Sequence, residues 1–95
     1  MGVNSMRECK LDGRQMDTRA EAWVHIREVL ALPAYFGNNL DALADCLGEI
    51  QGVTIHLVHA NAARNALGTY ADRLIQVFEQ ASAGRADLTF RVSQR

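Results

Sequence analysis

Apolar and polar positions follow two different spacings along the chain, and these spacings predict three strands and four helices. Residues 6–11, 53–59 and 88–92 carry apolar side chains at alternate positions, which is typical of strands with one buried face. Between them, apolar residues recur at spacings of three and four, which is typical of helices with one buried stripe. We expect these helices to begin at Asp17 or Thr18, at Leu40, at Ala60 and after Gly68.

The order of these elements predicts the fold. A pair of helices separates each strand from the next, and such crossovers join parallel strands through right-handed connections. The sequence therefore predicts an α/β fold with a small three-stranded parallel sheet and about four helices. A chain of 95 residues is long enough for one domain with one core. We expect this domain to span residues 6–95 and to follow a short, frayed polar tail of residues 1–5.

The helix expected from Leu40 carries two stripes of opposite character. The apolar stripe comprises Leu40, Leu43, Ala44 and Leu47. The acidic stripe comprises Asp41, Asp45 and Glu49. The helical period places the two stripes on roughly opposite sides, so we expect the leucines to be buried and the acids to be exposed. Like charges at this spacing destabilise a helix, so the acidic stripe is either an ordinary solvated face or a surface for a partner.

The segment before this helix contains the residues that end one helix and begin the next. Pro33 prevents continuation of the preceding helix. Gly37 can adopt the positive φ that a sharp loop needs, so we expect the turn there. Asn38 or Asn39 can cap the new helix by accepting bonds from its free backbone N–H groups.

Residues 32–47 read LPAYFGNNLDALADCL, and this run resembles the signature of the barstar family of ribonuclease inhibitors. The family's pattern there is Leu-Pro-x-Tyr-aromatic-Gly-x-Asn-Leu-Asp-Ala-Leu-x-Asp-Cys-Leu, which the chain matches without a gap. Weaker similarity extends from about Cys9 to about Val92. The resemblance implies the fold described above and a bacterial inhibitor of antitoxin or immunity type. Its implied partner is a cognate secreted ribonuclease or related toxin with a basic active-site cleft.

The resemblance also implies which residues contact the partner. Asp41 and Asp45 match positions at which the family places carboxylates where RNA phosphates would lie, and loop residues match further contact positions. The expected contact residues are Tyr35, Gly37, Asn38, Asn39, Asp41, Ala44, Asp45, Gly48, Glu49 and Gln80. Some positions depart from the family: Ala44 replaces a tryptophan, and Gln80 and Gly84 replace glutamates. These departures put barnase itself in doubt as the partner, because specificity depends on such positions.

Composition and charge agree with a binding protein. Net charge is −1, and no Lys or Arg occurs from Glu28 to Ala63, so we expect no direct binding of nucleic acid. No apolar stretch approaches the ~20 residues of a membrane span, so we expect no membrane association. The two cysteines, Cys9 and Cys46, are few for a secreted scaffold, although sequence leaves a disulfide between them open. We expect a cytoplasmic protein that is monomeric when free.

Three catalytic arrangements are weaker interpretations of the same residues. His56 and His59 are three apart in an expected strand and would point to opposite faces, so they are poor ligands for one metal. Cys46 is next to Asp45, which would raise its pKa rather than activate it. Asp41 and Asp45 lack a second catalytic group, and the chain has no Gly-rich phosphate loop.

We therefore expect no enzyme activity, no catalytic residue, no metal and no cofactor. The alternative to a ribonuclease inhibitor is a barstar-like module that binds a non-ribonuclease toxin or another protein. A small hydrolytic enzyme is the least favoured of the three hypotheses.

Overall fold

The computed structural model describes residues 7–95, in which three strands alternate with two pairs of helices. The elements are β1 (Arg7–Asp12), the short 3-10 helix η1 (Gly13–Gln15), α1 (Arg19–Leu30), α2 (Leu40–Glu49), β2 (Val53–Val58), α3 (Ala60–Leu67), α4 (Thr69–Ser82) and β3 (Leu88–Val92). The expected tail of residues 1–5 and the expected strand residue Met6 lie outside the described residues.

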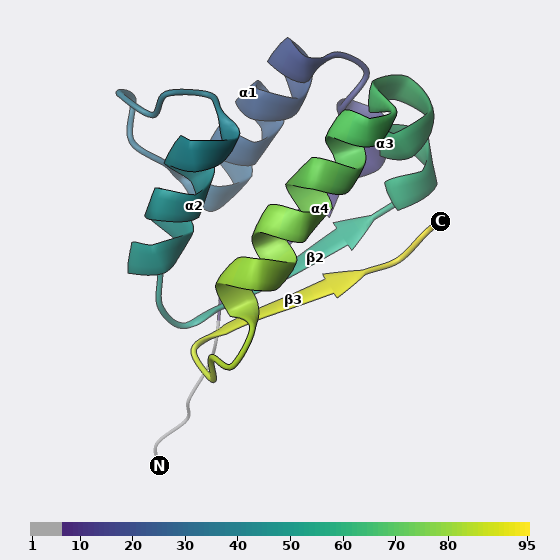
Figure 1. Cartoon of the computed structure of the whole chain (residues 1–95). Helices are drawn as coiled ribbons and strands as arrows, with labels where there is room; N and C mark the ends of the chain where they lie inside the picture. The colour runs from purple at the N-terminus through teal and green to yellow at the C-terminus, as the bar shows by residue number, and fades with distance from the viewer. Residues whose placement is uncertain (1–6) are drawn as a thin grey trace.

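The three strands form one parallel sheet in the order β1-β2-β3. In its register Cys9 lies beside Ile55, and Ile55 lies beside Phe90. Helices α1, α2 and α4 lie together on one side of the sheet (Figure 1). This arrangement confirms the predicted α/β fold with a three-stranded parallel sheet and four helices.

The core lies between the sheet and the helices, where the apolar positions of both meet. In β2, Val53, Ile55 and Leu57 are buried, while the residues between them are half-buried. The largest side chains that are fully buried are Leu11, Ile26, Leu43, Leu47, Ile55 and Leu88. They come from β1, α1, α2, β2 and β3, so α2 is fixed to the same core as the sheet.

The ends of the elements follow local chemistry, and two strands end one residue away from the sequence prediction: β1 continues to Asp12, and β2 stops before His59. Thr18 caps α1, and its Oγ1 accepts a bond from the N–H of Glu21 at 3.1 Å. The second strand ends at Val58 and does not include His59, whose φ of 55° places it in the left-handed region directly before α3. Gly84 follows α4 with a φ of 73°, a conformation that glycine adopts without strain.

Candidate functional site

Two neighbouring aromatic residues divide the loop between α1 and α2 into a buried anchor and an exposed surface. Phe36 is buried and packs against Trp23 of α1, with 5.6 Å between the ring centroids. Tyr35 points the other way and is 89% exposed, far more than a tyrosine with a packing role. The loop is therefore fixed to the core by one ring and presents the other to solvent.

Asn39 organises the start of α2. Its Oδ1 accepts a bond from the N–H of Ala42 at 2.8 Å, and its Nδ2 donates to the carbonyl of Gly37 at 3.1 Å. The left-handed residue of this turn is Asn38, with a φ of 53°, so the expectation of a positive φ at Gly37 is wrong. Asparagine is among the few residues that tolerate this conformation. Gly37 serves a different need, because a Cβ there would lie 3.0 Å from Asn39 Nδ2.

The apolar stripe of α2 is narrower than the sequence pattern predicts. Leu43 and Leu47 are fully buried, whereas Leu40 is only half-buried and Ala44 is exposed. Successive helical residues are about 100° apart, so Ala44 is turned well away from the side that Leu43 presents to the core. The expected burial is confirmed for two leucines, and Ala44 belongs to the exposed surface instead.

The acidic stripe of α2 consists of Asp41, Asp45 and Glu49, and all three are exposed. None of their side chains takes part in an ion pair or a hydrogen bond with any of residues 7–95. Asp41 lies in the first turn, where the helix dipole favours an anion. Asp45 and Glu49 lie beyond that turn, so their charges are not offset by the helix itself.

The other expected contact residues lie around this stripe. Gly37, Asn38 and Asn39 precede α2 and are exposed, as is Gly48 in its last turn. A Cβ at Gly48 would meet nothing within 4 Å, so packing does not explain a glycine at this position. Gln80 is exposed on α4, which lies beside α2 (Figure 1). All ten expected contact residues are thus on the surface, and all but one belong to residues 35–49.

Arg85 holds the C-terminal end of α2, and the sequence pattern gave no sign of this role. Its guanidinium donates to the carbonyl of Leu47 at 2.8 Å and to the carbonyl of Ile50, and it pairs with Asp87 at 3.0 Å. The bond from Arg85 lowers the pKa of Asp87. A cation at a helix C-terminus satisfies free carbonyls and opposes the dipole. The two bonds to carbonyls join residues more than 30 positions apart, and the only local signal is the Arg85-Ala86-Asp87 spacing.

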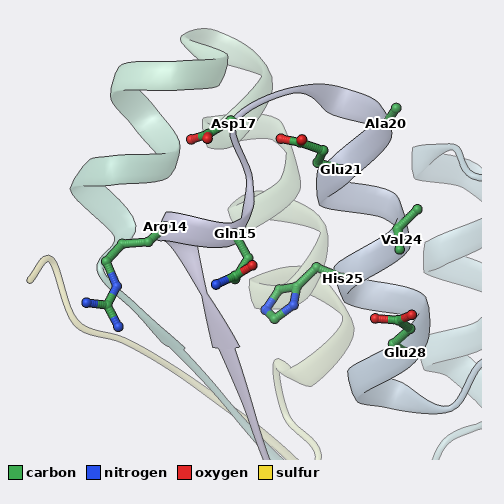
Figure 2. A pocket seen from close by; sticks show the side chains of 8 residues that line it. All are labelled: Arg14, Gln15, Asp17, Ala20, Glu21, Val24, His25 and Glu28. Atoms are coloured by element: carbon green, nitrogen blue, oxygen red, sulfur yellow. The ribbon is translucent and has the colours of Figure 1, made fainter.

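A hollow lies away from these residues and is lined by η1, the segment that follows it and α1 (Figure 2). It is lined by acidic residues of α1 and by His25, which points from α1 toward β1 (Figure 2). The Nε2 atom of His25 accepts a bond from the N–H of Asp12 at 2.9 Å, and burial lowers the histidine's pKa. This bond satisfies a backbone donor of the last residue of β1 and requires neutral histidine.

The groups considered for catalysis are not arranged as a reactive centre. Burial raises the pKa of the Cys46 thiol, and the charges of Glu49 and Asp45 raise it further, so the thiol is not activated. His56 is bonded to Ser93 Oγ at 2.7 Å, and His59 belongs to the turn before α3. Cys9 and Cys46 are both free. Within residues 7–95 no group of three His, Cys, Asp or Glu side chains is placed to hold a metal, and none of the helices is long and apolar enough to cross a membrane.

Comparison with known proteins agrees with this geometry. Residues 6–94 match the family described as Barstar (barnase inhibitor). A protein of Bacillus subtilis (strain 168), named "Putative ribonuclease inhibitor YrdF", is 35% identical over 78 residues, which cover 80% of this chain and 86% of that protein. The match to the family covers every element described above, from β1 to the residues after β3. On these grounds the chain belongs to the barstar family.

Proposed function

We propose that the protein is an inhibitor of a secreted ribonuclease and that it acts inside the cell that produces the enzyme. The observation that carries this proposal is the exposed acidic stripe of α2, whose three carboxylates have no partner in residues 7–95. The family match and the relative named as a ribonuclease inhibitor support the same class of partner.

The stripe acts by occupying the positions of RNA phosphates. A ribonuclease binds phosphates with cationic side chains in a cleft, and carboxylates on a helix offer the same kind of acceptor. Arginine binds a carboxylate through two parallel hydrogen bonds, which gives geometric selectivity as well as energy. Asp45 lies at the middle of the stripe and is the central contact, with Asp41 and Glu49 one turn before and after it.

The helix is held rigidly enough for this role. Asn39 caps its first turn, Leu43 and Leu47 anchor its inner side, and Arg85 binds carbonyls at its far end. A carboxylate on a fixed helix loses little conformational freedom on binding, so more of the interaction energy appears as affinity. Complementary charge also speeds the encounter with a basic enzyme.

The surroundings of the stripe determine which enzyme fits. Tyr35, Gly37, Asn38 and Asn39 are exposed in the loop before α2, and Ala44 and Gln80 are exposed where the resemblance to the family implies larger or charged groups. An enzyme that differs from barnase at the edge of its cleft would fit such a surface.

The test is a titration of the purified protein into small secreted microbial ribonucleases, barnase included, with hydrolysis of a fluorescent RNA as the readout. We expect activity of the cognate type of enzyme to fall to zero at one inhibitor per enzyme. Asp45→Asn removes the central charge while keeping the side chain's shape, and Asp17→Asn removes a charge on another surface as a matched control. Inhibition of none of the enzymes, or equal inhibition by parent and Asp45→Asn, contradicts the proposal.

A further inference from the structure

A hollow of about 360 Å³ opens beside the acidic stripe, between the loop after α1 and the outer side of α2. Pro33 and Tyr35 contribute to its loop side, and Asp45, Cys46 and Glu49 to its helix side. It is separate from the hollow of Figure 2, with which it shares no residue. Its place next to Asp45 means that a protein seated on the stripe would cover it.

The inner surface of this hollow is apolar. Leu32, Cys46 and Ile50 line it, and each is half-buried and packs against the core. The Cys46 thiol is neutral because burial and the adjacent carboxylates raise its pKa. Such a surface accommodates the methylene groups of a long side chain whose charged end remains at the opening.

The opening is negatively charged. Asp45 and Glu49 are four residues apart on α2, which places them about 6 Å apart along the helix axis. Arg85, whose guanidinium bonds the carbonyl of Ile50, is itself paired with Asp87 and does not pair with Glu49. A cation entering the hollow would therefore meet two carboxylates that have no ion pair within residues 7–95.

Tyr35 adds a flat aromatic surface on the side of the hollow opposite the helix. Its ring is almost fully exposed, and no other aromatic ring of residues 7–95 stacks on it. A guanidinium binds over such a ring by cation–π attraction and stacking. The same chain contains an example, since the guanidinium carbon of Arg19 lies 4.0 Å from the ring centroid of Tyr70.

We propose that this hollow is a subsite for one arginine side chain of the ribonuclease, held between Glu49 and Tyr35. The inference rests on the proposed function and deepens it by naming the ribonuclease side chain that would meet the stripe at Glu49 and Tyr35. The planar guanidinium has donors for a carboxylate at its edge and a face for the tyrosine ring, whereas the compact ammonium of lysine offers no such face.

The subsite is tested on the free protein by two-dimensional NMR, with Nα-acetyl-arginine amide as the probe. We expect saturable shifts at the amides of Tyr35, Cys46 and Glu49, and none with the uncharged isostere Nα-acetyl-citrulline amide. Glu49→Gln should weaken binding of the probe by roughly fivefold, the upper end for one exposed ion pair. Tyr35→Leu should weaken it as well, while Glu21→Gln on α1 is the matched control and should leave it unchanged.

Different outcomes contradict the subsite and the proposed function. An equal response to the citrulline probe, shifts confined to another surface, or unchanged binding by Glu49→Gln overturns the subsite. So does equal inhibition of the cognate ribonuclease by the parent and Glu49→Gln. If the protein inhibits none of the ribonucleases in the titration described above, that result contradicts the proposed function itself.

Discussion

Replacing Asp45 with alanine should separate recognition from folding. The Asp45 side chain is exposed, and it forms no hydrogen bond or ion pair with residues 7–95. Asp41 and Glu49, each four residues away on α2, repel its charge. The folded protein therefore loses no contact when the carboxylate is removed, and the helix is relieved of two unfavourable pairs.

The size of the effect follows from these features. Alanine is the better helix former by roughly 0.5 kcal/mol, and each like-charge pair at this spacing costs about 0.2–0.5 kcal/mol. The variant should thus be more stable by about 1 kcal/mol, which raises Tm by about 4–8 °C in a domain of this size. Binding should weaken by about 2–5 kcal/mol, a range that the barnase–barstar complex itself helped to establish.

The assay compares thermal unfolding of the parent and Asp45→Ala at low ionic strength with inhibition of the cognate ribonuclease by each. Glu21→Ala, which removes an exposed carboxylate of α1, controls for the change in net charge. A fall in Tm of several degrees would show that Asp45 stabilises the fold. Inhibition equal to that of the parent would show that the carboxylate plays no part in recognition, and either result refutes the reasoning.

Four further predictions follow from other contacts. Leu43→Ala empties a fully buried site and should lower the free energy of unfolding by about 2–5 kcal/mol in urea titration, and a much smaller loss would mean that α2 is not packed on the core. Arg85→Ala should lower Tm and speed hydrogen exchange in the last turn of α2, with Arg85→Lys restoring protection only in part. The pKa of His25 is lower in the folded protein than in the unfolded chain, so the unfolded state binds a proton first as pH falls. The free energy of unfolding should therefore fall as pH drops below about 6.5, and His25→Gln should flatten that dependence between pH 7.5 and 5.5. Association with the ribonuclease should slow as salt rises while dissociation changes less, and a flat association rate would remove electrostatic steering from the mechanism.

The sequence predicted the architecture because periodicity is a strong signal over several residues. Strand β2 alternates buried and half-buried positions as its sequence does, and α2 places Leu43 and Leu47 inside while its acids face outward. The contact residues were named through the family signature, and the structure places them all on the surface. Their individual contributions to binding remain predictions.

Contacts between segments that are distant in the sequence could not be predicted from local patterns. Arg85 reaches the end of α2 across more than 30 residues, and nothing near it in the sequence indicates that target. The width of a buried stripe is likewise set by neighbouring elements, so Ala44 fits the helical period and is nevertheless exposed. At the turn, Gly37 and Asn38 are neighbours that both tolerate a positive φ, and the structure places Asn38 in that conformation while the Gly37 carbonyl accepts the bond from Asn39.

The opposite orientations of Tyr35 and Phe36 have an evolutionary consequence. Phe36 is held by Trp23, so substitutions there disturb the core and are removed by selection for folding. Tyr35, Ala44 and Gln80 have no such duty and can change one at a time without loss of the scaffold. Under the proposed function, an inhibitor lineage can therefore follow changes in its enzyme through substitutions at these surface positions, and the loop keeps its position while specificity diverges.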